Sequence, residues 1–179
     1  MGRLIDLVRG WPGKPSHPPL TDASIGAYTV GVAMLAAGAL GIEEEEMAHG
    51  SLIAISGGLA LAAPTALTGL LDWLRIEKGT PRRTVATIHL ITMVSATLVF
   101  AGAWLAQRPG YLDGQVESLG LGLGLAAEIL LAAGGYIGGA LVFIYGVRVV
   151  GRPEAPIAAA LVPGRVEPEP TKSNRTEAT

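Results

Sequence analysis

The sequence predicts an all-α integral membrane protein, a bundle of four transmembrane helices. Hydrophobic residues make up 50% of the 179 residues and charged residues only 16%, whereas about a quarter of the residues in a soluble domain are charged. The charges are also clustered, which leaves four long stretches without any. A helix needs about 20 apolar residues to cross a hydrocarbon core about 30 Å thick. We therefore expect a multi-pass protein of a cell membrane, inner or plasma.

Residues 1–22 are expected to form an N-terminal interfacial segment. Apolar side chains recur there at helical spacing, with Arg3 and Arg9 among them: Leu4, Leu7, Val8 and Trp11. This pattern is typical of a short helix lying in the headgroup plane, with an aromatic residue at the interface. An unstructured tail is the alternative. The prolines from Pro12 to Pro19 are expected to break any helix.

A four-helix transmembrane domain is expected over residues 23–150. The uncharged stretches that predict its spans are residues 23–42, 47–71, 84–107 and 129–147, and an outward extension of the fourth helix over residues 119–127 is an alternative. Four adjacent acids, Glu43 to Glu46, precede the second stretch. Because acids are favoured at the positive end of the helix dipole, they indicate a helix start rather than a cation site.

Glu128 stands at the outer edge of the fourth predicted span. An acid inside a membrane is a candidate functional residue. A shift of this span by a few residues would instead place Glu128 at the interface, and we expect this boundary position.

The basic residues predict the orientation of the chain. Twelve of the 13 Lys and Arg residues fall on one side of the predicted spans, and only Arg108 falls on the other. Cytoplasmic loops carry the excess of basic residues. Both termini and the loop from Arg75 to Arg83 are therefore expected in the cytoplasm, and residues 151–179, rich in Pro, Glu, Ala and Thr, are expected to be a disordered cytoplasmic tail.

Small residues in the fourth span predict close helix packing. Two pairs of glycines recur four residues apart, offset by one position: Gly134 with Gly138, and Gly135 with Gly139. Such spacings let helix backbones approach in lipid. The sequence leaves open whether they pack within one bundle or in a homodimer.

Two histidines and two acids, His17, Asp22, Asp72 and His89, are expected on the cytoplasmic side. Imidazole can ligate haem iron or another metal, and a carboxylate can orient its second nitrogen. Structural pairing is the alternative: His89 would hydrogen-bond across helices, and Asp72 would pair with Arg75 or Arg82. Ion or proton handling is a further alternative.

Three short motifs occur in the order and spacing of a known family. Residues 17–28 (HPPLTDASIGAY) are similar to its N-terminal motif, residues 69–73 (GLLDW) to the end of its second helix, and residues 134–139 (GGYIGG) to its fourth-helix glycine motif. Over residues 16–150 the chain resembles a four-helix bacterial membrane domain of unknown function. In some relatives that domain is fused to a Rieske iron–sulfur domain.

The resemblance implies four helices, a His in the third helix at His89, and a membrane or redox protein as partner. This chain also departs from the family. Relatives often carry a His where Ala140 stands and an Asn near Thr92 or Met93. A pairing of His89 with an imidazole at position 140 is therefore unavailable here. Since the chain has no Cys, it builds no iron–sulfur cluster of its own.

Three functions remain open. The first is a non-catalytic scaffold or docking module in the lipid bilayer. The second is a membrane subunit of an electron-transfer system, with haem or a metal held by His17 and His89. The third is ion or proton translocation by Glu128 and Asp72. A net charge of −2 and the lack of a basic stripe with aromatics give no sign of nucleic-acid binding, and no catalytic motif predicts an enzyme.

Overall fold

The computed structural model describes residues 2–11, 13–151 and 155–162. Four long helices make up the body of the protein: α2 (His17–Ala39), α3 (Glu44–Leu74), α4 (Pro81–Asp113) and α5 (Ser118–Phe143). Four short elements accompany them: α1 (Gly2–Arg9), β1 (Gly10–Trp11), β2 (Lys14–Pro15) and α6 (Ile157–Leu161). Each long helix is long and apolar enough to cross a membrane, which confirms the predicted all-α bundle.

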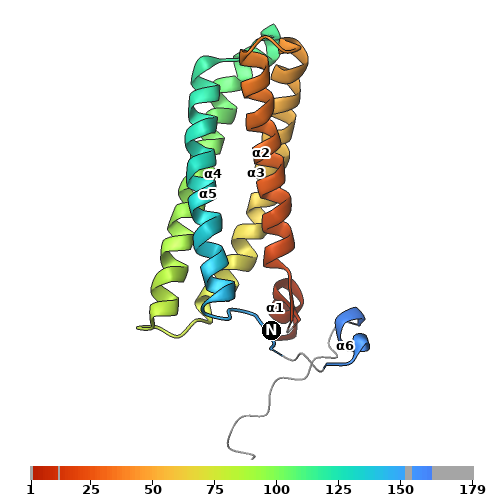
Figure 1. Ribbon diagram of the computed structural model, residues 1–179, viewed down its shortest axis with the longest axis vertical. Coiled ribbons are helices and arrows are strands. Elements are labelled where there is room, and N and C mark those ends of the chain that lie inside the picture. The colour runs from red at the N-terminus through yellow and green to blue at the C-terminus, as the bar shows by residue number, and fades with distance from the viewer. Residues whose placement is uncertain (1, 12, 152–154, 163–179) are drawn as a thin grey trace, which may run out of the picture.

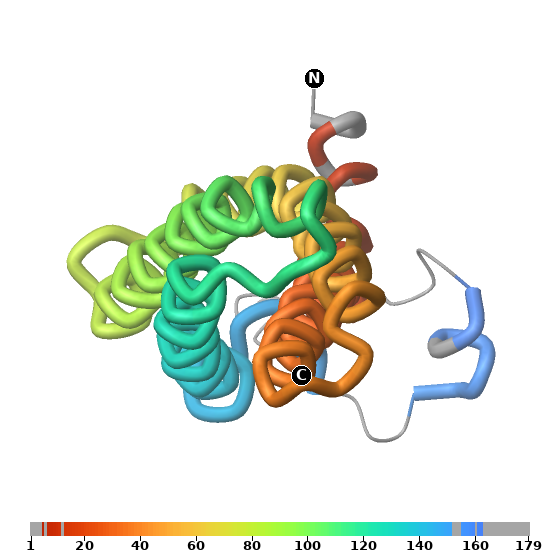
Figure 2. The backbone as a smooth tube through the Cα atoms, turned by 90° about the horizontal axis from the view of Figure 1, so that it is seen from above, coloured from red at the N-terminus to blue at the C-terminus, as the bar shows by residue number. Residues whose placement is uncertain are grey.

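The four long helices run alternately up and down (Figure 1). Contacts join α2 to α3, α3 to α4, α4 to α5 and α5 back to α2, so the helices form a closed ring (Figure 2). We call the end that carries α1, residues 75–80 and residues 144–151 the lower end, as in Figure 1. The turns at residues 40–43 and 114–117 form the upper end.

The helix boundaries follow from local sequence signals. Glu44, Glu45 and Glu46 occupy the first turn of α3, which confirms that these acids mark a helix start. Thr80 caps α4, since its hydroxyl accepts a hydrogen bond from the Arg83 N–H at 3.2 Å. The same helix ends at Asp113 and is followed by Gly114, whose φ of 68° is a left-handed conformation that suits glycine.

The prediction that the N-terminal prolines break any helix was wrong for the last two. Pro18 and Pro19 lie in the first turn of α2, which begins at His17. Proline is tolerated there because the first N–H groups of a helix have no partner within it.

The fourth long helix extends outward over the glycine-containing residues 119–127, as the sequence allowed. Helix α5 begins at Ser118 and ends at Phe143, so its end comes before residue 147, the end of the predicted stretch. Gly120 and Gly124 of its first turns face neighbouring helices, and the chain leaves the helix before Gly146, whose φ is +61°. Glu128 therefore lies inside the helix, about 15 Å along its axis from Ser118 at ~1.5 Å per residue, and not at its edge.

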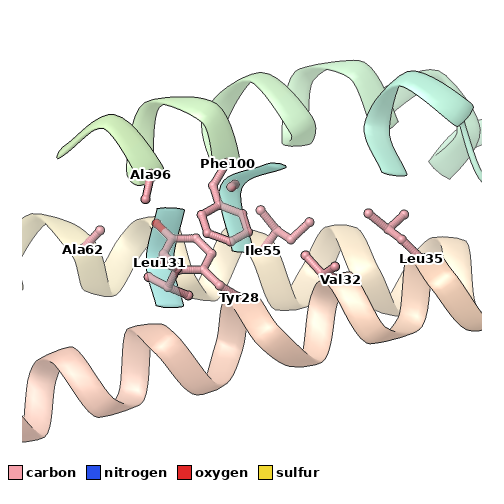
Figure 3. Packing of buried hydrophobic residues seen from close by; sticks show 9 residues of the cluster. Tyr28, Val32, Leu35, Ile55, Ala62, Ala96, Phe100 and Leu131 are labelled. Carbon is pink, nitrogen blue, oxygen red and sulfur yellow. The ribbon is translucent and has the colours of Figure 1, made fainter. Parts of the chain in front are cut away.

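A packed core fills the middle and upper part of the bundle (Figure 3). The rings of Tyr28 and Phe100 stack with centroids 3.9 Å apart, and Leu35 and Ile55 are fully buried nearby. Gln107, also fully buried, donates to the Gln115 carbonyl at 2.8 Å and accepts from the Glu117 N–H at 2.9 Å. These bonds satisfy backbone groups of the turn before α5.

The short elements lie at the lower end. Helix α1 contacts α3, and Trp11 pairs with Lys14 in the two-residue strands that follow it. Its predicted place in the headgroup plane stays a prediction. Of the tail, residues 157–161 form α6, and the predicted disorder otherwise falls on residues 152–154 and 163–179, outside the described residues.

Candidate functional site

A cavity of about 680 Å³ lies between the four helices in the lower half of the bundle. Its lining is mostly apolar and comes from every long helix. All four polar residues predicted from the sequence line this cavity: His17, Asp22, Asp72 and His89. The volume falls within the range of about 300–1,000 Å³ that is typical of small-molecule and cofactor sites.

His17, the first residue of α2, lies against α3. Its Nδ1 is 3.0 Å from the carbonyl oxygen of Thr65, and its ring packs on Gly69. A Cβ at position 69 would lie 2.7 Å from His17 Cε1, so only glycine leaves room for the ring. Thr68 adds a hydroxyl 3.4 Å from the same nitrogen.

His89 of α4 repeats this arrangement against α5. Its Nδ1 is 2.9 Å from the carbonyl oxygen of Gly134, and its ring packs on Gly138. A Cβ at position 138 would lie 2.9 Å from His89 Cε1. In both cases the carbonyl belongs to the residue four positions before the glycine.

These contacts fix the tautomer of both histidines. A carbonyl oxygen only accepts hydrogen bonds, so the Nδ1 of His17 and of His89 each carries a hydrogen and donates it. In a neutral ring the other nitrogen, Nε2, then presents a lone pair. Neither Nε2 has a hydrogen-bond partner within the described part of the chain.

Asp72, at the end of α3, forms ion pairs with two arginines distant in sequence, and it accepts a hydrogen bond from the first of them, Arg9. Its Oδ1 lies 2.7 Å from Arg9 Nη2 and 3.6 Å from Arg148 Nε. Arg148 also donates to the carbonyl oxygens of Arg9 and Gly10, at 2.7 Å each. The sequence had suggested Arg75 or Arg82 as the partner of Asp72. The structure instead joins the N-terminal segment and the segment after α5 to this carboxylate.

The other acid of the predicted cluster is different. Asp22 is exposed, and its side chain forms no hydrogen bond or ion pair with the other residues that the structure describes. It lines the cavity near its lower edge but does not join Asp72.

The two glycine pairs of α5 have different surroundings. Gly134 and Gly138 face α4, where Met93 and His89 lie against them. Gly135 and Gly139 line the cavity, and a Cβ at either position would meet nothing within 4 Å. One pair therefore packs within the bundle and the other leaves space open. A homodimer, which the sequence left open as an alternative, stays untested.

Tyr28 lies where the cavity meets the packed core. It is 2% exposed, and its hydroxyl interacts with the Thr97 side chain but makes no hydrogen bond of normal geometry among the described residues. A buried polar group without a partner is costly, and a molecule in the cavity could accept this hydrogen bond.

The remaining residues considered from the sequence lie elsewhere. His49 is at the upper end, where its Nε2 lies 2.8 Å from the Tyr111 carbonyl oxygen. Ala140, where relatives often have a His, does not line the cavity. Among the described residues, no group of three or more His, Cys, Asp or Glu side chains could hold a metal ion.

Sequence reasoning missed several contributors: Tyr28, Thr65, Arg9 and Arg148. A signal existed for Thr65, since Thr-x-x-Thr-Gly at residues 65–69 places hydroxyls and a glycine on one helix face. The two arginines gave no such signal, because a contact between residues 9, 72 and 148 depends on the whole bundle.

Of the comparisons with known proteins, the one with protein families agrees with this architecture. No curated protein and no solved structure matches the chain. A family model described as "Predicted membrane protein (DUF2231)" matches residues 13–151. This range includes all four long helices and both cavity histidines, and the chain therefore belongs to this family of predicted membrane proteins.

Proposed function

We propose that the protein is an electron-transfer membrane subunit that binds haem b between His17 and His89. The observation that supports this function is the state of the two imidazoles. Both line one mostly apolar cavity, both use Nδ1 to hold a backbone carbonyl, and neither Nε2 has a hydrogen-bond partner among the residues that the structure describes. A ligating histidine usually has this second hydrogen bond, which sets the tautomer and orients the ring.

The residues of the site fit a haem. Porphyrin nitrogens supply four ligands to the iron, so two imidazoles complete its coordination. Helix bundles commonly build such sites from side chains on facing helices, and here the histidines come from α2 and α4. The open space beside Gly135 and Gly139 suits a flat apolar ring system.

Each part of the site has a distinct role in this proposal. His17 and His89 would supply the ligating Nε2 atoms, and Thr65 and Gly134 would hold the rings in place through their carbonyls. Tyr28 would donate its hydroxyl to the bound molecule, and the mostly apolar lining would contact the porphyrin ring. A bound haem would supply one-electron oxidation and reduction.

An absorption spectrum tests the proposal. The protein is purified from haem-replete cells, and haemin is added to any apoprotein. We expect a Soret band and the visible bands of low-spin haem in the natural protein. His17→Ala and His89→Ala should each lose these bands or convert them to a high-spin spectrum.

His49→Ala is the matched control, because His49 is the third histidine of the chain and lies at the other end of the bundle. Its spectrum should equal that of the natural protein. A natural protein that stays colourless after addition of haemin contradicts haem binding. So does a spectrum that neither cavity substitution changes. In either case the docking role predicted from the sequence would be the one to pursue.

A further inference from the structure

Glu128 is a half-buried ionisable residue on the outer side of the seam between α2 and α5, where its partner Thr29 is exposed, and neither the core packing nor the proposed haem site uses it. It lies well inside α5, and its Oε1 accepts a hydrogen bond from Thr29 of α2 at 2.8 Å. Its Oε2 is buried and has no partner among the described residues. The carboxyl group is therefore held in place at one oxygen and left unsatisfied at the other.

The seam between α2 and α5 explains how the carboxyl group reaches Thr29. One turn above, Gly124 lies against Val32 and Leu35, so the two helices approach closely. One turn below, Leu131 and Tyr28 belong to the core and line the cavity. Glu128 thus lies at about the level of the upper boundary of the cavity. It does not line the cavity, and its partner Thr29 is exposed on the outer side of the seam.

No opposite charge is available at this depth. Residues 23–39, 50–71 and 90–107 of the other three helices contain no Asp, Glu, Lys, Arg or His. On α5 itself the only other titratable residue is Tyr136, which is 85% exposed. On α2 the titratable neighbour is Tyr28, whose ring stacks on Phe100 inside the bundle.

An unpaired carboxylate in hydrocarbon is costly, and the group relieves this cost by taking up a proton or a cation. A metal cation would need several oxygen ligands, whereas the side chains described here provide two oxygens of Glu128 and the Thr29 hydroxyl, which is already donating. A proton needs only Oε2.

We propose that Glu128, positioned by Thr29, is a proton-binding site within the membrane that exchanges its proton with water. This site is independent of the haem proposal, since neither residue lines the cavity. Binding converts the carboxylate to the neutral acid by forming an O–H bond at Oε2, and release returns the proton to water.

Infrared difference spectroscopy in lipid nanodiscs tests this site. The natural protein minus Glu128→Gln should show the carbonyl stretch of a protonated carboxylic acid at pH 8, where a glutamate in water is almost entirely ionised. The band should shift in D₂O buffer, because the proton exchanges. Thr29→Val should move it to higher frequency through the lost hydrogen bond, and Thr29→Ser should restore it.

A second measurement does not depend on the folding of a variant. Dicyclohexylcarbodiimide, which reacts with protonated carboxyl groups in apolar surroundings, should modify Glu128 in the natural protein at pH 8. Glu117, at the start of the same helix, should stay unmodified. A carboxylate signal from Glu128 at pH 8, or a band that does not shift in D₂O, overturns the proposal. Equal modification of both residues overturns it as well.

Discussion

At the scale of single residues, the space inside the cavity depends on the positions of four glycines. Gly69 and Gly138 each make room for an imidazole ring, while Gly135 and Gly139 leave space inside the cavity. Sequence spacing identified the two glycine pairs of α5 but gave them the same role. It could not separate them, because positions offset by one residue point about 100° apart on a helix, and only the neighbours decide what each one meets.

Gly138→Ala is expected to destabilise the protein. The new Cβ would lie 2.9 Å from the His89 ring, and overpacking of this kind costs about 1–3 kcal/mol. This cost exceeds the ~0.5–1 kcal/mol that alanine gains over glycine in a helix. Thermal unfolding in detergent should show a lower Tm, and the haem content should fall with it.

Gly139→Ala is the control, since its Cβ meets nothing within 4 Å. Its Tm should equal or slightly exceed that of the natural protein. Equal Tm values for the two variants would show that the His89 ring can move aside for the methyl group. The close packing of this ring on Gly138 would then not contribute to the stability of the protein.

The two histidines illustrate what a sequence can establish about a site. Their apolar surroundings and their shared side of the bundle predicted a common region, and the structure places both on one cavity. Their carbonyl partners were not predictable, because a side-chain bond to another helix depends on the rotation of both helices. The cavity that His89 shares with His17 also differs from the arrangement that the family pattern at position 140 implied.

At the scale of helices, the bundle is two hairpins of similar design. The α2–α3 and α4–α5 hairpins each hold a histidine on one helix by a carbonyl and a glycine of the other. The existence and order of the four helices were predictable, since long apolar stretches specify them. Their ends were not, because α2 and α5 extend into segments that contain prolines or many glycines.

The lower ends of these hairpins are joined through Asp72. Its side chain is 11% exposed, and that of Arg9 is 8% exposed. Asp72→Asn would leave two guanidinium groups without their shared carboxylate, and removal of one partner from a buried ion pair costs about 3–5 kcal/mol. We expect a clearly lower Tm and faster proteolysis of the segment around Arg9.

Asp22→Asn removes the same charge from an exposed side chain of the same region. Its effect should stay within about 0.5 kcal/mol. If both substitutions lower the Tm equally, the effect comes from the loss of a negative charge near the lower end, and the contacts of Asp72 with Arg9 and Arg148 are not its cause.

At the scale of the whole molecule, the bundle separates its charges. Among the described residues the upper end carries Glu43 to Glu46, Asp113 and Glu117, with Arg108 as its only basic residue. The lower end carries the basic loop of residues 75–83 together with Arg9, Lys14 and Arg148. Because basic segments are retained in the cytoplasm, the lower end and the cavity of His17 and His89 are predicted to face it, and the acidic turns the other side.

Cysteine labelling tests this orientation on a background that needs no prior substitution, since the chain has no Cys. Lys78→Cys lies in the lower loop and Gln115→Cys in an upper turn, and both positions are exposed. A membrane-impermeant maleimide should label Gln115→Cys in intact cells and Lys78→Cys only after permeabilisation. The reverse pattern would contradict the predicted orientation and would place the histidine cavity near the outer surface of the membrane.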